Sequence, residues 1–193
     1  MNKREDKKEA ILLAGMDVMK AAGYNGTSVK DIVDAAGVPK GSFYNYFESK
    51  EQFAIDAIEH ASAEGREYAT TLLENTTLTP LERLTRFFES GIECATNNDY
   101  KQGCFLGNMC QEMADASDDI RNTLDQNLSK LTKMLAKVII EGQQNGTFKS
   151  TQNAQVIAEF LFNAWEGSLM RAKAAKSCTP LQAFKGMFSS ALG

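Results

Sequence analysis

Hydrophobic residues recur every three or four positions along most of the chain, which is the spacing of one face of an α-helix. Residues that start and stop helices lie between these stretches. Ser28 with Asp31 three positions later has the pattern of a capping box, and Gly37 marks a helix end. No stretch alternates apolar and polar residues as a half-buried strand would. The predicted helices cover residues 4–22, 29–36, 40–47, 50 to the seventies, 80 to about 96, about 101–115, 118–144, 151–175 and 180–192.

The second and third predicted helices are joined by a short turn at residues 37–39, Gly-Val-Pro. Two short helices joined in this way form a helix-turn-helix, whose second helix can lie in the major groove of DNA. Phe43 and Phe47 are four residues apart and share a face of that second helix, so we predict that they anchor it in the core. Tyr44 and Asn45 then project away from the anchor, because a two-turn helix cannot bury all its faces.

The residue types on this short helix suit a nucleic-acid surface. Gly41 lets the backbone approach a phosphate closely, and the hydroxyls of Tyr44 and Tyr46 can donate to phosphate oxygens. Asn45 can reach a base edge. Lys50 adds a positive charge at the start of the next helix, where backbone N–H groups already favour an anion.

These features predict an all-α fold of about nine helices in two parts. We expect an N-terminal three-helix helix-turn-helix DNA-binding domain over residues 1–50. A C-terminal helical bundle for ligand sensing and dimerisation would follow over residues 51–193, with the fourth helix as the connector.

The overall charge does not support DNA binding by itself. The chain has a net charge of −4 and a sequence pI of about 5.2, and its first sixty residues hold eight Lys and Arg against ten Asp and Glu. An acidic protein can bind DNA only if its basic residues lie on one rim, and its affinity should fall steeply with salt. The basic cluster at the N-terminus is either a flexible arm that aids binding or a solvated tail. The basic residues that could form the rim are Lys3, Arg4, Lys7, Lys8, Lys40 and Lys50.

Cysteine and histidine usage argues against a metal site and against catalysis. Cys94, Cys104, Cys110 and Cys178 form no CxxC pair, and His60 is the only histidine, so a structural zinc site is not expected. A thiol enzyme needs a base near its cysteine, and His60 lies in the fourth helix, beside the DNA-binding part. We therefore expect no cofactor and no enzymatic activity.

No stretch approaches the roughly 20 apolar residues that a bilayer span requires. The charged N-terminus, MNKREDKKE, is not followed by the apolar segment of a signal peptide. We expect a cytoplasmic protein with reduced thiols and no membrane partner.

The stretch TSVKDIVDAAGVPKGSFYNYFESKEQF, residues 27–53, resembles the TetR family of bacterial repressors. It holds that family's Thr-rich cap, Ala-Ala-Gly-Val turn, aromatic recognition helix and Ser-Lys-Glu exit. The resemblance is strong over residues 8–58 and weaker beyond. It implies a DNA-binding transcriptional regulator whose candidate DNA contacts are Thr27, Ser28, Lys40, Gly41, Ser42, Tyr44, Asn45, Tyr46 and Lys50.

The same resemblance implies a homodimer formed by the eighth and ninth helices. A two-fold dimer would place its recognition helices about one DNA turn apart, roughly 34–36 Å, and so would bind a palindromic operator.

The segment KQGCFLGNMCQEM, residues 101–113, opens the helix that in this family couples the ligand site to DNA binding. We expect Cys104 in its first turn, where the positive helix end favours a reactive thiolate. The Gly-Cys pair is similar to that of the electrophile-sensing subgroup that includes the N-ethylmaleimide reductase repressor, which also presents a lysine at the position of Lys173. The candidate sensing residues are Cys104, Phe105, Met109, Met113, Trp165, Met170 and Lys173.

Alternatives to an electrophile inducer stay open at this point. A free cysteine is commonly a small buried hydrophobe. In that case the inducer would be an apolar small molecule bound noncovalently in a cavity lined by the same aromatic and methionine side chains. A helical adaptor that binds protein instead of DNA would leave Tyr44 and Asn45 unexplained.

Overall fold

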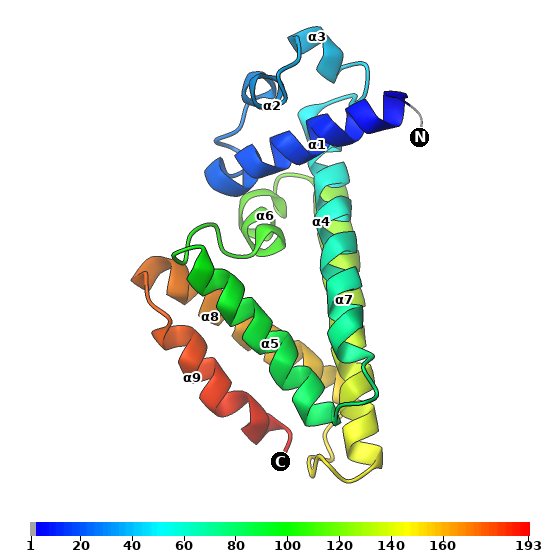
Figure 1. Cartoon of the computed structure of the whole chain (residues 1–193), viewed down its shortest axis with the longest axis vertical. Helices are drawn as coiled ribbons and strands as arrows, with labels where there is room; N and C mark the ends of the chain where they lie inside the picture. The colour runs from blue at the N-terminus through cyan, green and yellow to red at the C-terminus, as the bar shows by residue number, and fades with distance from the viewer. Residues whose placement is uncertain (1–2) are drawn as a thin grey trace. The chain divides into compact units, whose positions relative to one another are not determined.

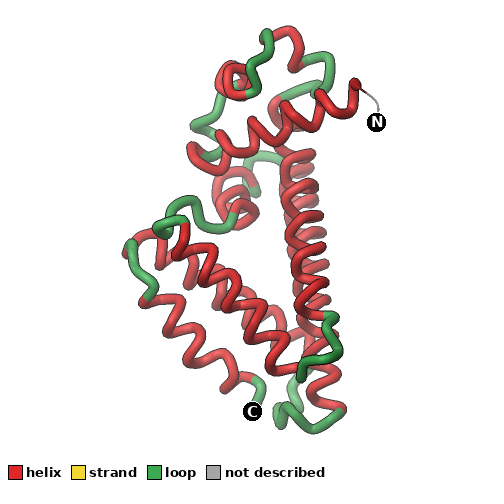
Figure 2. Tube along the Cα trace, viewed as in Figure 1, coloured by secondary structure: helices red, strands yellow, loops and turns green. Residues whose placement is uncertain are grey.

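The structure is a computed structural model that describes residues 3–193, in which helices are joined by turns and loops (Figures 1 and 2). Nine α-helices and one short 3-10 helix occur in the described residues, with no strand, as the hydrophobic pattern predicted. None of the described helices combines the length and the apolar composition that a membrane span requires. The helices are α1 (Lys3–Ala22), α2 (Val29–Ala35), α3 (Lys40–Phe43), α4 (Lys50–Leu73), α5 (Pro80–Asn97), α6 (Phe105–Met113), α7 (Asp118–Gln144), α8 (Ala154–Ala175), α9 (Thr179–Met187) and the 3-10 helix η1 (Phe188–Ala191).

The chain divides into two compact units, each with its own hydrophobic core. The first unit holds residues 1–63 and 105–127, and the second holds residues 64–104 and 128–193. Helices α4 and α7 therefore contribute residues to both units. The two units differ in compact packing, whereas the predicted boundary at residue 50 separates functions. That boundary therefore stays a prediction.

The core of the first unit joins α1, α2, α3 and the beginning of α4 to α6 and the beginning of α7. Phe43 and Phe47 are buried at its centre, with ring centroids 5.8 and 5.0 Å from that of Phe53 in α4. Buried aromatic side chains of this size supply much of the free energy of a small core. The prediction that Phe43 and Phe47 anchor the third helix is confirmed.

An aromatic cluster lies at the centre of the second unit. The ring of Phe88 in α5 lies 5.6 Å from Trp165, 4.8 Å from Phe184 and 5.6 Å from Phe188, measured between ring centroids. Trp165 packs directly over Gly91, where an added Cβ would lie 2.5 Å from its Cζ2. Trp165 is thus a packing residue that fixes α8 against α5.

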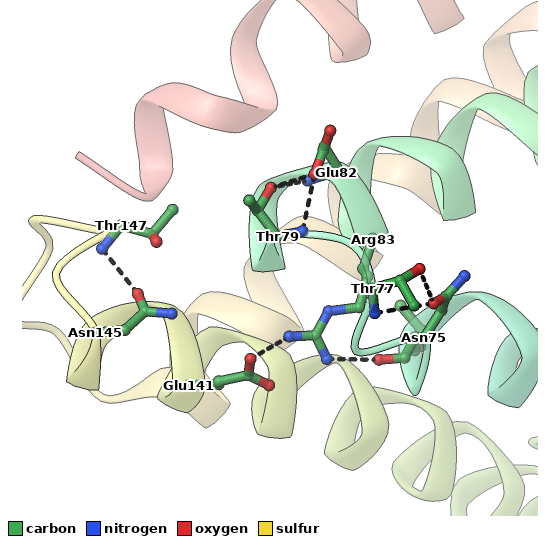
Figure 3. A network of polar contacts seen from close by, with 9 residues as sticks. Asn75, Thr77, Thr79, Glu82, Arg83, Glu141, Asn145 and Thr147 are labelled. Carbon is green, nitrogen blue, oxygen red and sulfur yellow. Dashed lines mark hydrogen bonds and ion pairs between the residues drawn. The ribbon is translucent and has the colours of Figure 1, made fainter.

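A buried arginine holds α5 against the end of α4 and against α7 (Figure 3). Arg83 is 3% exposed, donates to the carbonyl of Leu73 at 3.0 Å and forms an ion pair with Glu141. Thr79 is the N-cap of α5 and forms a capping box with Glu82. The hydrogen bond from Arg83 lowers the pKa of Glu141 below its ordinary value of 4.5.

This ion pair predicts a pH dependence of stability. Because the carboxyl pKa of Glu141 is lower in the folded chain than in the unfolded chain, ionised Glu141 stabilises the fold above about pH 4.5. That contribution is lost as the pH falls through the folded pKa. We expect the difference in urea midpoint between wild type and Glu141→Gln to be largest at neutral pH and to shrink below pH 4.5.

The matched control is the same change made in an Arg83→Met background. There Glu141→Gln should have an effect that does not vary with pH, because the hydrogen-bonding partner is gone. Equal pH dependence in both backgrounds would contradict the assignment of this effect to the ion pair.

Four predicted helices are clearly shorter than the sequence pattern indicated. The eighth, expected over 151–175, begins at Ala154, and the ninth, expected over 180–192, ends at Met187 and is followed by η1. The third, expected over 40–47, ends at Phe43, because the chain then tightens into turns through bonds such as Tyr46 N–H to the Phe43 carbonyl at 3.0 Å. The sixth, expected over 101–115, covers Phe105–Met113 only. Left-handed backbone at Gln102 and Gly103 is incompatible with a helix before Phe105.

Candidate functional site

The turn between α2 and α3 is formed by local hydrogen bonds. Ser28 caps α2 and forms the predicted capping box with Asp31, whose pKa is lowered by the bonds from Ser28. Gly37 adopts a φ of +64°, which reverses the chain at little steric cost. The Val38 N–H then donates to the Val33 carbonyl at 3.0 Å, and α3 starts directly after Pro39.

One side of α3 faces the core and the other faces solvent. Opposite the buried Phe43, Tyr44 is 55% exposed, and Lys40, Gly41 and Asn45 are exposed as well. The Tyr44 ring lies edge-on to that of Phe43. A rigidly anchored helix turn therefore presents a lysine, a tyrosine and an asparagine outward.

Gly41 is not explained by packing inside the chain. A Cβ added there would meet no atom within 4 Å, and its backbone does not lie in the left-handed region. A glycine in a helix costs up to about 1 kcal/mol relative to alanine. The close approach of a DNA phosphate to this backbone, which the sequence predicts, stays a prediction.

Ser42 and Tyr46 lie between these two sides. Both are half-buried, and Tyr46 packs against the first core. Their hydroxyls can still reach a ligand at the rim of α3.

Three of the predicted DNA contacts have internal partners. The hydroxyl of buried Thr27 donates to the Gly23 carbonyl at 2.7 Å, and the hydroxyl of Ser28 donates to Asp31 at 2.6 Å. The ammonium of Lys50 donates to two backbone carbonyls of the turn between α1 and α2. These residues shape the site from within, and a direct contact to phosphate by any of them remains a prediction.

The basic cluster at the N-terminus forms the first turns of α1 from Lys3 onward, so in the described residues it is a helix and neither a flexible arm nor a tail. Whether it aids DNA binding stays a prediction. The Arg4 guanidinium donates to the backbone carbonyl of Asn45 at 3.4 Å. Lys8 pairs with Asp56 at 2.6 Å and lies over the Phe47 ring. Arg4 thus places a positive charge next to the exposed end of α3.

The second candidate site is Cys104, which stands directly before α6 and not in its first turn as predicted. Its side chain is partly exposed and forms a hydrogen bond with the carboxyl of Glu166 from α8. Burial raises the pKa of Glu166 above its ordinary value, and the bond from Cys104 opposes that effect. A thiol and a largely buried carboxyl group are therefore in contact.

Sequence reasoning missed Glu166. Its signal was a single carboxylate in the otherwise uncharged stretch FLFNAWEGSLM of α8, beside Trp165. A charged residue in such a stretch needs a partner or a function. Lys173, which the sequence suggested as the partner of Cys104, is exposed two helical turns after Glu166 on the same face of α8.

The other predicted sensing residues are divided between the two units. Phe105, Met109 and Met113 pack in the first core, whereas Trp165 packs in the second and Met170 is exposed. Most of them therefore have a packing role in the fold, and a role in ligand binding stays a prediction.

An apolar face on α8 and α9 has no partner within the described chain. It carries Phe160, 61% exposed, and Met187, 67% exposed, together with Val156. Gly167 of α8 and Gly186 of α9 have open space where a Cβ would be. The two helices pack against each other, so together they form one candidate surface for another chain (Figure 1).

Comparison with known proteins agrees with this geometry. Residues 11–57 match the family described as "Bacterial regulatory proteins, tetR family", and residues 80–188 match the "Tetracyclin repressor-like, C-terminal domain". The first match contains the helix-turn-helix with α3, and the second contains Cys104, Glu166 and α8.

Named relatives are similar over nearly their whole length. The transcriptional repressor DhaR of Mycobacterium sp. strain GP1 is 33% identical, over 98% of this chain and 93% of its own. The repressor NemR of Escherichia coli K12 is 27% identical, over 94% of this chain and 92% of its own.

Solved structures agree as well. The crystal structure of a regulatory protein TetR from Rhodobacter sphaeroides superposes with a TM-score of 0.90 at 30% identity, covering 96% of this chain and 98% of that one. The reduced form of E. coli NemR superposes with a TM-score of 0.86 at 25% identity, covering 96% of each chain. This chain therefore belongs to the TetR family of DNA-binding transcriptional regulators.

Proposed function

We propose that this chain is a dimeric repressor that binds a palindromic operator through α3 and leaves it when an electrophile modifies Cys104. The observation that carries the DNA-binding part is a set of exposed residues on α3 and in the turn directly after it, Lys40, Gly41, Tyr44 and Asn45, which we call the exposed group on α3. In this proposal residues 1–50 bind DNA, and residues 51–193 sense the inducer and form the dimer.

The roles on α3 follow from side-chain chemistry. Asn45 can donate and accept at a base edge, and Tyr44, Tyr46 and Ser42 can donate hydroxyl hydrogens to phosphate oxygens. Lys40 supplies a positive charge for the phosphate backbone. Since the chain is acidic overall, this local charge should give binding that weakens as salt increases.

Dimerisation through α8 and α9 is supported by their apolar face. Exposed Val156 and Phe160, four residues apart on α8, and exposed Met187 on α9, with glycines that leave room for a close approach, suit an interface between two copies of one chain. A two-fold axis at this face would bring two α3 helices to two half-sites.

The contact between Cys104 and Glu166 supports covalent sensing. In the reaction with a maleimide or a quinone, the Cys104 sulfur forms a bond to an alkene carbon, and the thiol proton moves to the Glu166 carboxylate. The proton then passes to the enolate carbon of the adduct, so that Glu166 ends ionised as it began. A carboxylate whose pKa is raised by burial is a better base for this step.

The location of Cys104 connects this reaction to DNA binding. Cys104 immediately precedes α6, and α6 packs in the same core as α3 through Met109 and Met113. An adduct at Cys104 would displace the start of α6 and shift the population toward a state that does not fit the operator. The similar structure of E. coli NemR is that of its reduced form, and a reduced thiol is likewise the state in which Cys104 would react here.

Treatment with N-ethylmaleimide tests the sensing part. We expect wild type to release operator DNA and to carry the adduct at Cys104, with Cys104→Ser retaining the DNA. Glu166→Gln keeps the size of the side chain and cannot accept the proton, so alkylation of Cys104 should slow by at least about tenfold. Mass spectrometry of timed samples measures the rate, and fluorescence anisotropy measures release.

Exposed Cys94 provides the internal control, since its alkylation rate should be the same in wild type and Glu166→Gln. Release in both wild type and Cys104→Ser would show that the electrophile does not act through Cys104. Alkylation of Cys104 at the wild-type rate or faster in Glu166→Gln would show that the carboxylate does not accept the thiol proton. Release by an unreactive apolar molecule would favour the noncovalent alternative.

A further inference from the structure

Glu112, near the end of α6, contacts a part of the first unit that is distant in sequence. Its carboxylate accepts a hydrogen bond from the backbone N–H of Asn25 at 2.9 Å, across 87 positions of the chain. Asn25 lies in the turn between α1 and α2, residues 23–28, which we call the α1–α2 turn. Glu112 is partly buried, and its neighbours Met109 and Met113 anchor α6 in the first core.

The carboxylate of Glu112 fits closely against this turn. A Cβ added to Gly23 would overlap its Oε1, and Gly23 has a φ of +78°. Any other residue at Gly23 would therefore push Glu112 away and adopt a strained backbone. Both the backbone conformation and the close packing of Glu112 therefore require glycine at position 23.

Lys50 of α4 holds the same turn from another side. Its ammonium donates to the carbonyls of Tyr24 and Thr27 at 2.9 and 2.8 Å and lies 4.0 Å from the centroid of the Tyr24 ring. Burial lowers the pKa of Lys50, and the negative charge of Glu112 opposes this shift. The α1–α2 turn is thus held between a cation from α4 and an anion from α6.

The α1–α2 turn sets the position of the helix-turn-helix. It ends with Ser28, the N-cap of α2, and Thr27 ties it back to Gly23 through a side-chain hydrogen bond of 2.7 Å. Helix α2 packs directly on α3. A change in the turn therefore moves the exposed group on α3 without any change in that group.

A negative charge is an unusual choice at this point. Glu112 lies by Gly23, just beyond the C-terminus of α1, where the helix dipole disfavours an anion. A glutamine could accept the Asn25 hydrogen bond without that cost. The negative charge of Glu112 is explained if it helps to hold the Lys50 ammonium in place.

We propose that Glu112 is a positioning residue for operator binding, which holds the α1–α2 turn from α6 and releases it when α6 moves. This proposal rests on the proposed function and adds to it a direct route from α6 to the helix-turn-helix that does not pass along α4.

The test uses the full-length protein, an operator duplex selected by wild type from random sequences, and a nonspecific duplex. For Glu112→Ala we expect operator binding to weaken about 3- to 30-fold, the range for residues coupled to a site they do not touch. Nonspecific binding should stay unchanged, because the phosphate-binding charges are intact. Hydrogen exchange of the Asn25 amide, measured by mass spectrometry over residues 23–28, should become faster.

Two matched variants accompany Glu112→Ala. Glu112→Gln keeps an acceptor for the Asn25 N–H and removes the charge, so it should restore slow exchange and part of the affinity. Gln111→Ala changes the exposed neighbour on α6 and should behave as wild type. In wild type, N-ethylmaleimide should accelerate exchange over residues 23–28 as it releases the operator.

Wild-type affinity and exchange in Glu112→Ala would overturn the proposal and leave the repressor function standing. Operator release by N-ethylmaleimide without a change in exchange over residues 23–28 would overturn it as well. Equal losses of operator and nonspecific binding would show that the variant has only lost structure, and would overturn the positioning role. If wild type itself selects no operator, the proposed function fails, and this inference fails with it.

Discussion

Replacing both Tyr44 and Asn45 with alanine should nearly abolish operator binding and leave the fold intact. A side chain at a base edge contributes about 1–3 kcal/mol to recognition. A dimer on a palindrome loses this twice, so the expected loss is about 2–6 kcal/mol, or about 30-fold to 10⁴-fold in affinity. Fluorescence anisotropy with an operator duplex measures it.

The fold should tolerate these two changes because both side chains face solvent. Tyr44 is 55% exposed, and surface substitutions of this kind usually change stability by less than about 0.5 kcal/mol. Tyr68 of α4 is 53% exposed and offers a matched control, since Tyr68→Ala should bind the operator as wild type does. Unchanged operator binding by the double variant would refute the assignment of α3 as the DNA-reading element.

The second large effect is expected from Phe160→Glu on α8. A charge in the centre of an apolar interface is strongly unfavourable, so this variant should sediment as a monomer of 21.2 kDa, and wild type as a dimer of twice that mass. The monomer contacts one half-site at a time. Operator affinity should therefore fall about 10²- to 10⁴-fold through the loss of bivalent binding.

Gly186→Leu on α9 provides an independent test of the same face. The open space at Gly186 lets the folded chain accept a side chain, and leucine favours the helix more than glycine does, yet its bulk would block a close approach of the partner. Tyr68→Glu introduces a charge at an exposed aromatic on α4 and should remain dimeric. If Phe160→Glu and Gly186→Leu both remained dimeric and bound the operator with wild-type affinity, this interface would be excluded.

Local sequence signals predicted the fold well. The capping box at Ser28 follows from residues three positions apart, and the anchoring of α3 follows from the four-residue spacing of Phe43 and Phe47. Each of these features depends on neighbours within one helical turn. Sequence alone carries that information.

The lengths of α3 and α6 were predicted incorrectly because they depend on backbone conformations that the residue types do not indicate. Asp99, Tyr100 and Gln102 are not glycines, yet each has a positive φ, which no hydrophobic pattern reveals. The predicted start of α6 was therefore too early, and Cys104 was placed inside a helix that begins after it.

The partners of the site residues were beyond prediction because they come from distant parts of the chain. Glu166 meets Cys104 across 62 positions, and Glu112 meets Asn25 across 87 positions. Lys50 was predicted to contact phosphate from its location at a helix start, whereas two of its N–H groups bind carbonyls of the α1–α2 turn. Such contacts depend on tertiary packing, which local sequence patterns do not reveal.

The most direct test of the central claim is selection of DNA by the wild-type protein from a library of random duplexes. We predict enrichment of a two-fold symmetric sequence with half-site centres one helical turn apart, or a whole multiple of it, and no enrichment by the Tyr44→Ala/Asn45→Ala variant. No enriched sequence with wild type, or the same sequence enriched by the variant, would contradict the claim that this protein reads a palindromic operator through α3.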